Sequence, residues 1–517
     1  MTGALDPSTP VAVIGAGTMG RGIARVAAGA GHPVLIFDAS AAAVTDAIDE
    51  TRRRLLRDVE KGRLDQEAAG SIADRITPCS RLEAVAAAGL VIEAILEDLD
   101  VKTDVFRRVE SVVDDSTILA SNTSSLSITA IGAGLSRPDR MAGMHFFNPA
   151  QLMPLVEVVV GDASAGDTVD TLMATAAAWG KTPVRAASTP GFIVNRVARP
   201  FYGEGLRLLQ EGVADHATID DIVTGAGGFR MGPFRLLDLV GLDVNLAVSN
   251  SVYEQTFHDA RFAPNVIQQS LVHAGRLGRK TGRGFYDYGD RAAVGPGDSA
   301  TGDGAPSQLA SKVLAVGDLG HAAGLVTRLD NAGVAIEQQR ADGGPGHLRL
   351  GGSVLVPTDG RCATELAAAG TFGTDEIAVV DLARDWASAT RVAVTEAAQA
   401  TGGPGAVWAA AIEGAGVAVS LVGDSPGLVL MRIVSQLASV AADAVLTGVA
   451  VAEDVDTAMR LGTNYPAGPL EWADALGAEA VVSVLDHLQA FYGEDRYRAA
   501  TLLRRSALVG SPVRGGT

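Results

Sequence analysis

Residues 11–38 read VAVIGAGTMGRGIARVAAGAGHPVLIFD, and this stretch decides the fold of the first part of the chain. The apolar runs at residues 11–16 and 33–38 predict two buried strands. Residues 17–31 predict a helix between them that begins on glycines. A strand, a helix and a second strand in this order are typical of a parallel sheet with crossover helices, so we expect an α/β domain.

The turn between the first strand and the helix carries a G-x-G-x-x-G motif, formed by Gly15, Gly17, Thr18, Met19 and Gly20. In such a motif the first glycine permits a tight turn and the second lets a pyrophosphate approach the backbone. The third glycine lets the helix pack closely on the strand, and the helix N-terminus faces the anion. A glycine-rich turn without a ligand is the alternative interpretation.

Asp38 ends the second strand, at the place where an acidic side chain accepts a hydrogen bond from the adenosine ribose. Ala39 and Ser40 follow it, so no basic side chain is available there for a 2′-phosphate. The motif and Asp38 together predict a Rossmann-type domain that binds NAD rather than NADP.

The composition describes an ordinary globular protein. At 517 residues the chain should form about three or four domains. Its net charge of −18 disfavours nucleic acid as a partner, and no run approaches the roughly 18 apolar residues of a membrane span. The N-terminus shows no signal-peptide pattern. The two cysteines, Cys79 and Cys362, lack metal-type spacing, so we expect a cytoplasmic protein without a metal site.

The second half of the chain repeats helical text of the first half at a constant offset. Thr189-Pro190-Gly191 and Ser425-Pro426-Gly427 differ by 425 − 189 = 236 residues. The same offset relates four further pairs: Asp220 and Asp456, Gly232-Pro233 and Gly468-Pro469, Asp238 and Asp474, and Gly241 and Gly477. A register held over this length indicates an internal duplication.

We expect the chain to fall into five segments. They are a Rossmann-type domain at 1–187 with a helical arm at 41–77, an all-α domain at 188–288, a linker at 289–308, a degenerate Rossmann-like domain at 309–420, and a second copy of the all-α domain at 421–517. The degenerate segment has Gly317, Gly320 and Gly324 but no G-x-G pair, so we expect one cofactor site in the whole chain.

The stretch GMHFFNPAQLMPLVEVV places His145 and Glu157 on either side of a turn signal, Asn148-Pro149. Because a chain that leaves one strand and re-enters another brings such residues side by side, we expect the two to meet. A histidine held by a carboxylate is a usual general base for a hydroxyl. A core histidine near a solvent-facing glutamate is the alternative.

These motifs, together with EAILEDLDVK, SNTSSL and TPGFIVNR, resemble those of the L-3-hydroxyacyl-CoA dehydrogenase family. The likeness is dense over residues 11–288 and looser beyond. The two-copy length, with GRLGRKTGRGFYDYG at the end of the first helical copy, is similar to that of the bacterial 3-hydroxybutyryl- and 3-hydroxyadipyl-CoA dehydrogenases of phenylacetate breakdown. The all-α copies then correspond to the C-terminal domain of the family.

The resemblance implies NAD-dependent oxidation of (3S)-3-hydroxyacyl-CoA to 3-oxoacyl-CoA. It implies that His145 is the base and Glu157 its orienter, and that Ser124 and Asn195 hold the substrate oxygen and the reacting face. It also implies cofactor contacts near the nicotinamide ribose for Glu97, Lys102 and Asn122. An exposed helical pair is the alternative for Glu97 and Lys102.

In the family the arm lies over the CoA moiety, so Arg54 and Lys61 are candidate phosphate contacts, although a solvated helix face is an equal alternative. We expect Asn148 to brace the histidine loop and to contribute to the substrate site. Met431 stands where Asn195 stands in the first copy, so the second copy is expected to be structural. It would act as an internal partner in a monomer, and a homo-oligomer is the alternative.

Two other functions stay open on the sequence alone. One is an NAD-dependent dehydrogenase of a free hydroxy acid or sugar acid, and the other is a non-catalytic protein that binds NAD. The four candidate groups Ser124, His145, Glu157 and Asn195 favour an enzyme, because a purely structural chain has no need for all of them.

Overall fold

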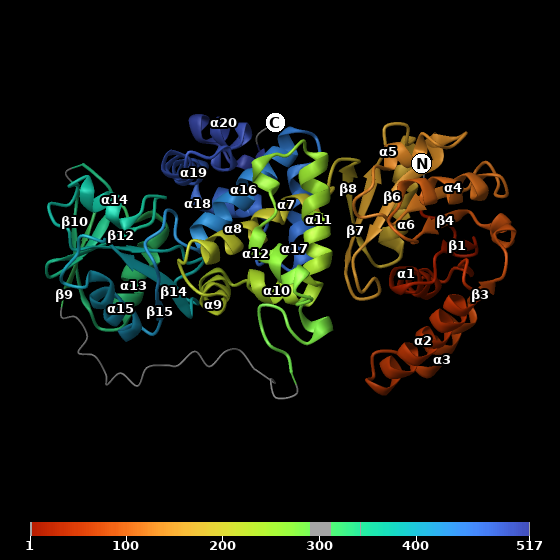
Figure 1. Ribbon diagram of the computed structural model, residues 1–517, viewed down its shortest axis with the longest axis horizontal. Helices are drawn as coiled ribbons and strands as arrows, with labels where there is room; N and C mark the ends of the chain where they lie inside the picture. Colours follow the sequence, from red (N-terminus) through yellow and green to blue (C-terminus); the bar gives the residue numbers. More distant parts are fainter. Residues whose placement is uncertain (1–2, 290–311, 342, 516–517) are drawn as a thin grey trace. The chain divides into compact units, whose positions relative to one another are not determined.

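The computed structural model describes residues 3–289, 312–341 and 343–515, and the chain forms two compact units (Figure 1). Unit 1 comprises Met1–Arg196 and Thr447–Thr463, and unit 2 comprises Val197–Leu446 and Asn464–Thr517. Apart from Gly289, the linker predicted at 289–308 lies outside the described residues. None of the helices in the described ranges has the length and apolar character that a membrane span requires.

Unit 1 is built on an eight-stranded sheet with the order β3-β2-β1-β4-β5-β6-β7-β8. All neighbours pair in parallel except β6 and β7, which are antiparallel. The strands are β1 Val11–Ile14, β2 Val34–Phe37, β3 Ile76–Cys79, β4 Leu90–Glu93, β5 Ile118–Ser121, β6 Met141–Phe146, β7 Leu155–Val160 and β8 Thr182–Ala187. The order reverses beside β1, which is where ligands bind in open α/β sheets.

The helices of unit 1 follow the expected alternation of strands and helices. They are α1 Thr18–Gly29, α2 Ala41–Glu60, α3 Gln66–Asp74, α4 Leu99–Glu110, α5 Ile128–Gly132 and α6 Gly166–Ala178, with α7 Val194–Val197 at the end of the segment. Figure 1 shows α2 and α3 projecting from the sheet as a helical pair, in the segment where the sequence predicts a helical arm at 41–77. Its last residues differ from the prediction because they enter β3.

Unit 2 contains a bundle of helices and a second sheet. The bundle consists of α8 Arg199–Gln210, α9 His216–Gly227, α10 Pro233–Val240, α11 Leu242–Gln255, α12 Val266–His273, α16 Leu430–Leu446, α18 Pro469–Leu476, α19 Ala478–Tyr492 and α20 Thr501–Val509. Its helical text therefore folds as the period-3.6 pattern predicts.

The second sheet has seven strands in the order β10-β9-β11-β12-β13-β14-β15. The strands are β9 Lys312–Val316, β10 Ala335–Gln339, β11 His347–Leu350, β12 Ser353–Pro357, β13 Ile377–Val380, β14 Arg391–Glu396 and β15 Ala418–Leu421, with helices α13 Ala323–Asn331, α14 Ala363–Ala368 and α15 Pro404–Gly414. The degenerate Rossmann-like segment predicted from the sequence is therefore a shortened, mixed sheet.

The duplication extends from the helices into the sheets. The bounds of β14 exceed those of β7 by the same offset as the helical repeat, since 391 − 155 and 396 − 160 are both 236. The bounds of α17 Ala452–Thr463 exceed those of α9 in the same way, since 452 − 216 and 463 − 227 are also 236. The sequence shows the repeat only in its helical part, so this is a finding of the structure.

The two related helices exchange places. Helix α17 comes from the second helical copy but belongs to unit 1, where it packs against β7 and β8. Helix α9 comes from the first copy and packs against β14 in unit 2. Each sheet is thus covered by a helix from the other half of the duplication.

A buried arginine joins the two helical copies within unit 2. Arg432 on α16 is fully buried, and its guanidinium bonds Glu204 Oε2 at 2.7 Å and Glu211 Oε2 at 2.9 Å, both from the first copy. It also donates to the hydroxyls of Tyr492 and Tyr497, at 2.9 and 2.8 Å. Removing one partner from such a fully hydrogen-bonded cluster is destabilising, because a buried carboxylate is then left without a counter-charge.

We expect Arg432→Met to lower the free energy of unfolding by about 3–5 kcal/mol, because Glu204 stays buried without its main counter-charge. Denaturant unfolding followed by tryptophan fluorescence measures the change. The matched control is Arg504→Met, because the Arg504 and Asp486 side chains are 41% and 43% exposed. This variant should lose less than about 1 kcal/mol. Equal losses in the two variants would contradict the cluster's role.

Candidate active site

His145 and Glu157 are direct partners across the antiparallel pair β6 and β7. Their side chains are buried, at 6% and 0% exposure of the residues, and the imidazole Nδ1 lies 2.6 Å from Glu157 Oε2. The expectation that the turn brings the two side by side is therefore confirmed. The alternative, in which the glutamate faces solvent, is wrong.

The second oxygen of Glu157 holds the backbone that follows the Thr189-Pro190-Gly191 turn. Its Oε1 accepts hydrogen bonds from Ile193 N at 3.0 Å and from Val194 N at 2.9 Å. The backbone enters this position through left-handed residues, Gly191 at φ +75° and Phe192 at φ +47°. A non-glycine residue with positive φ is uncommon, and such strain tends to occur at functional sites.

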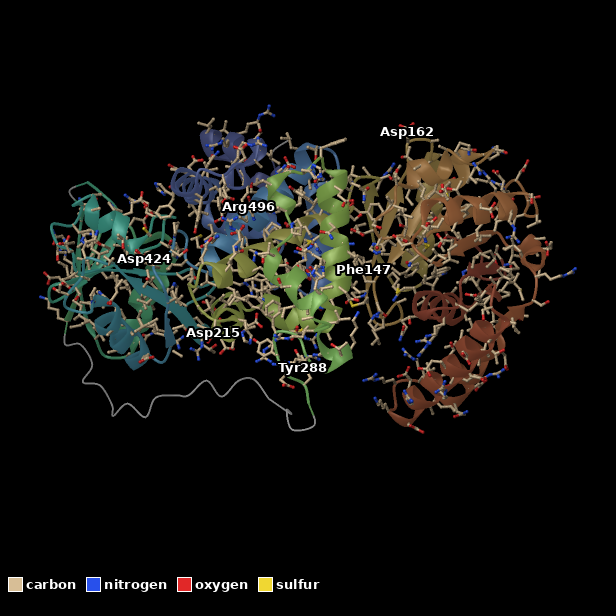
Figure 2. The ribbon with its side chains drawn as sticks, in the orientation of Figure 1. Phe147, Asp162, Asp215, Tyr288, Asp424 and Arg496 are labelled. Atoms are coloured by element: carbon tan, nitrogen blue, oxygen red, sulfur yellow. The ribbon has the colours of Figure 1, made fainter. Side chains whose placement is uncertain are left out.

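Aromatic rings fix the imidazole from two sides. The Phe147 and Phe192 ring centroids lie 4.5 and 5.9 Å from that of His145. Figure 2 labels Phe147 and Asp162, which lie at opposite ends of the β6 and β7 pair. Glu157 engages Nδ1 of the imidazole, so Nε2 is the ring nitrogen that this contact leaves available.

Ser124 and Asn195 meet at the same end of the sheet. The Asn195 amide donates to the Ser124 carbonyl at 3.4 Å, and Asn195 follows directly on the Val194 held by Glu157. Asn122 accepts a hydrogen bond from Phe146 N at 2.8 Å and so ties the end of β5 to the end of β6. The structure thus brings together residues predicted at distant positions of the sequence.

The loop that carries Ser124 is held by Glu97. Its carboxylate accepts bonds from Thr123 Oγ1 at 2.5 Å, Ser124 N at 3.0 Å and Ser125 N at 3.1 Å. Although burial opposes it, the Lys102 ammonium and these donors lower the pKa of Glu97. The Glu97 carboxylate thus holds the loop through hydrogen bonds to residues 123–125.

Lys102 is buried, with 1% exposure, so the alternative of an exposed helical pair is wrong. Its ammonium lies 2.6 Å from Glu93 Oε1 and 3.2 Å from Glu97 Oε2. The other oxygen of Glu93 accepts from Ser121 Oγ at 2.6 Å. The sequence patterns did not single out Glu93 or Ser121. The signal that could have indicated Glu93 is an acidic residue at the end of an apolar strand.

The glycine turn fits a dinucleotide. Gly15 has φ +106°, and the Asp38 carboxylate accepts bonds from Ala16 N at 2.8 Å and Ser40 N at 2.9 Å. Gly17 gives α1 no side-chain cap, whereas side chains cap α2, α3, α4 and α5. The first N–H groups of α1 are thus open to an anion, while Met19 is half-buried behind them.

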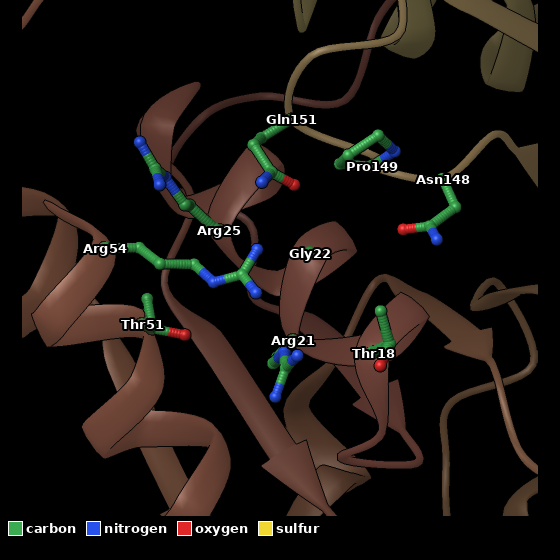
Figure 3. A pocket seen from close by; sticks show the side chains of 9 residues that line it. All are labelled: Thr18, Arg21, Gly22, Arg25, Thr51, Arg54, Asn148, Pro149 and Gln151. Carbon is green, nitrogen blue, oxygen red and sulfur yellow. The ribbon is translucent and has the colours of Figure 1, made fainter. Parts of the chain in front are cut away.

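A small pocket, open to solvent, lies between α1, the arm and the loop after β6 (Figure 3). Its cations are Arg21 and Arg25 from α1 and Arg54 from α2, and it is also lined by Thr18, Gly22, Thr51, Asn148, Pro149 and Gln151. Arg25 pairs with Asp58 and Arg54 with Glu50, at 2.5 and 2.6 Å. Figure 3 shows the Arg54 guanidinium pointing across the pocket towards α1.

The two remaining candidates of this region differ in position. Lys61 is exposed in the turn after α2 and is not among the residues that line the pocket, so its role as a phosphate contact stays a prediction. Asn148 is exposed and lines the pocket, so it does not brace the histidine loop. That loop is held instead by Asn122 and by Lys181, whose ammonium donates to the carbonyls of Ala150 and Met153 at 2.6 and 2.9 Å.

The second copy lacks these groups. At the same offset Asp381 stands for His145 and Ala393 stands for Glu157, and Asp381 N donates to Ala393 O at 3.0 Å. The Asp381 carboxylate accepts from Val429 N, Leu430 N and Met431 N at 3.1, 2.7 and 3.0 Å. One buried aspartate therefore does there what Glu157 does for the backbone in unit 1.

A dinucleotide turn next to a histidine held by a carboxylate is an arrangement suited to an NAD-dependent dehydrogenase. Family models agree. The 3-hydroxyacyl-CoA dehydrogenase NAD binding domain matches residues 10–189, and the C-terminal domain of the same enzyme matches residues 191–288 and 427–514. The 3-hydroxybutyryl-CoA dehydrogenase reduced Rossmann-fold domain matches residues 355–426.

Known proteins extend the similarity to nearly the whole chain. The 3-hydroxyadipyl-CoA dehydrogenase of Escherichia coli K12 is 43% identical over 504 residues, which is 97% of this chain and 98% of that protein. A probable 3-hydroxybutyryl-CoA dehydrogenase of Bacillus subtilis is 40% identical over 55% of this chain and 98% of its own length. The crystal structure of 3-hydroxybutyryl-CoA dehydrogenase from Escherichia coli K12 has a TM-score of 0.85 at 40% identity and covers 98% of this chain and 99% of that one.

The chain therefore belongs to the 3-hydroxyacyl-CoA dehydrogenase family. It is an NAD-dependent oxidoreductase, as the motifs predicted. Of the three functions considered from the sequence, the comparisons support this one over a dehydrogenase of free acids and over a non-catalytic NAD-binding protein.

Gly17→Ala is expected to leave the free protein intact and to weaken dinucleotide binding. A Cβ at Gly17 meets no atom within 4 Å, so the new methyl would clash only with a ligand phosphate. We expect an unchanged melting temperature and an NADH Kd raised on the order of ten-fold, equivalent to about 1.4 kcal/mol. Fluorescence titration with NADH measures the effect.

Gly20→Ala is the contrasting control. A Cβ at Gly20 would lie 1.8 Å from the Gly15 carbonyl oxygen, so this variant should lose thermal stability even without ligand. Wild-type NADH affinity in a folded Gly17→Ala protein would contradict the assignment of Gly17 to the pyrophosphate.

Proposed function

We propose that unit 1 oxidises (3S)-3-hydroxyacyl-CoA thioesters with His145 as the general base and Glu157 as the residue that positions it. The observation that carries the proposal is the bond of 2.6 Å between the imidazole Nδ1 and the buried Glu157 carboxylate. This bond fixes the tautomer with hydrogen on Nδ1, which leaves the lone pair on Nε2 for the substrate.

In the oxidation, Nε2 of His145 takes the proton of the C3 hydroxyl. The imidazolium that results lies against the Glu157 carboxylate, which stabilises its charge. Bound NAD supplies the hydride acceptor for the hydrogen on C3. A proton and a hydride leave adjacent atoms, so the base and the reacting face need fixed geometry.

Ser124 and Asn195 are proposed to hold the substrate oxygen and the reacting face. The hydrogen bonds of their backbone support these roles. Glu97 accepts from Ser124 N, and Glu157 accepts from the N–H of Val194, the residue before Asn195. Glu97, Lys102 and Asn122 border the same strand ends. We therefore propose that they act at the nicotinamide side mainly by holding the Ser124 loop and the end of β6.

The pocket of Arg21, Arg25 and Arg54 is proposed as the site for the CoA phosphates. Three guanidinium groups gather in it, and two carboxylates of the described residues, Asp58 and Glu50, form ion pairs with them. Guanidinium groups bind phosphate oxygens with two parallel hydrogen bonds. The arm thus contributes through Arg54, whereas Lys61 is outside the pocket.

The acyl group is proposed to be short. The relatives named above act on 3-hydroxyadipyl-CoA and on 3-hydroxybutyryl-CoA, and one of each spans nearly the full chain. We also propose that the chain carries one catalytic site, in a monomer whose second helical copy serves as an internal partner. Residues at the 236-residue offset support this, because the second copy has Asp381 in place of His145, Ala393 in place of Glu157 and Met431 in place of Asn195. The cytoplasmic location stays a prediction.

His145→Gln is expected to bind NADH normally and to lose on the order of 10²–10⁴ in kcat/KM, the range for a general acid–base group. The measurement is NADH absorbance with acetoacetyl-CoA as the substrate of the reverse reaction. His273→Gln, at an exposed position, is the control and should keep full activity. Turnover near the wild-type level in His145→Gln would refute the proposed base.

Arg21→Met is expected to raise KM for acetoacetyl-CoA roughly ten-fold, because a charged hydrogen bond is worth about 1.5–3 kcal/mol. KM for acetoacetyl-pantetheine, which lacks the nucleotide phosphates, should not change. Lys61→Met is the control and should leave both values unchanged. An equal rise of KM for both thioesters would show that the pocket is not the phosphate site.

A further inference from the structure

Helix α17 of the second helical copy lies against β7, the strand that carries Glu157, and against β8. Two backbone N–H groups of β8 attach its segment to the strand: Ala187 N donates to the Val449 carbonyl at 2.7 Å, and Arg185 N donates to the Asp454 side-chain Oδ2 at 3.0 Å. The helix then runs along β7 and β8. A part of the chain nearly 300 residues beyond Glu157 in sequence is thus built into the same unit.

The far end of α17 packs against Leu155 and Val194 at Gly462. A Cβ at this position would lie 2.8 Å from Leu155 Cδ2 and 3.0 Å from Val194 Cγ2. At these distances an added Cβ would displace Leu155, Val194 or the end of the helix. Leu155 and Val194 are 0% and 4% exposed, so neither side chain has free space into which to move.

Both neighbours of Gly462 are directly linked to the catalytic geometry. Leu155 begins the strand β7 on which Glu157 lies. Val194 donates its N–H to Glu157 Oε1 at 2.9 Å and immediately precedes Asn195. A displacement of Val194 by an added Cβ would therefore also shift the Glu157 carboxylate, which is proposed to orient His145, and the side-chain amide of Asn195.

We propose that α17 is a positioning element for this active site and that Gly462 is its positioning residue. The proposal rests on the proposed roles of His145, Glu157 and Asn195. In this way the second copy, which lacks the catalytic groups itself, sets the geometry of the first. The helix acts through Leu155 and Val194 and does not touch the reacting atoms.

Unit 2 contains a comparable glycine contact that has no histidine and carboxylate pair beside it. A Cβ at Gly227 on α9 would lie 2.8 Å from Phe229 Cδ2 and 2.9 Å from Leu430 Cδ1. Leu430 is the counterpart of Val194 at the 236-residue offset, and its N–H donates to Asp381 at 2.7 Å. Gly227 itself lies one residue out of that register, since 462 − 227 is 235. Gly227→Ala therefore crowds the counterpart of Val194, together with Phe229, where no histidine is present.

The experiment compares Gly462→Ala and Gly227→Ala in the full chain. For Gly462→Ala we expect kcat with acetoacetyl-CoA and NADH to fall roughly ten- to hundred-fold, as displacements on the order of 1 Å do, while KM and the NADH Kd change little. Gly227→Ala should keep the wild-type kcat. Adding Leu155→Val to Gly462→Ala removes the methyl group that overlaps most and should restore part of kcat.

The proposal is overturned if Gly462→Ala keeps its kcat, or if Gly227→Ala loses as much, because the contact would then serve stability alone. Should Gly462→Ala fail to fold, Asp454→Ala decides in its place. Loss of kcat in that variant supports positioning by α17, and a wild-type kcat overturns it. Failure of the proposed function is separate, since it would appear as turnover retained by His145→Gln.

Discussion

The buried carboxylate of Glu157 is the interaction on which the rest of the site depends. One oxygen engages His145 and the other accepts two backbone N–H groups at Ile193 and Val194. A fully buried charge is costly unless donors surround it, and these three donors offset that cost. Because the same group holds the proposed base and the start of the segment with Asn195, the orientation of the imidazole and the path of the chain are fixed together.

The second copy shows which part of this arrangement is structural. Asp381 keeps the contacts with the backbone, although it stands at the position of the histidine and not of the glutamate. Burial raises the pKa of its carboxyl to about 6, against the lowering effect of the backbone donors. The second copy keeps the backbone turn, with Gly427 at φ +70° and Leu428 at φ +51°, although Asp381 stands at the position of His145.

Sequence patterns predicted the groups whose signals are local. The G-x-G-x-x-G turn, Asp38, and His145 with Glu157 across a short turn all follow from motif spacing and strand alternation. The patterns failed where a side chain's surroundings come from distant segments. The burial of Lys102 between Glu93 and Glu97 and the exposure of Asn148 depend on packing that no periodicity encodes.

The sequence by itself determined the dinucleotide-binding class, the pairing of His145 with Glu157 and the duplication of the helical domain, because each leaves a pattern within a few residues or at a constant offset. Only the tertiary structure decided that the offset continues into β14 and that α17 joins unit 1. The physical reason is that a sheet preserves its register through backbone hydrogen bonds after its side chains have diverged. A helix, in turn, finds its partner by close packing, as Gly462 does against Val194, and not by nearness in sequence.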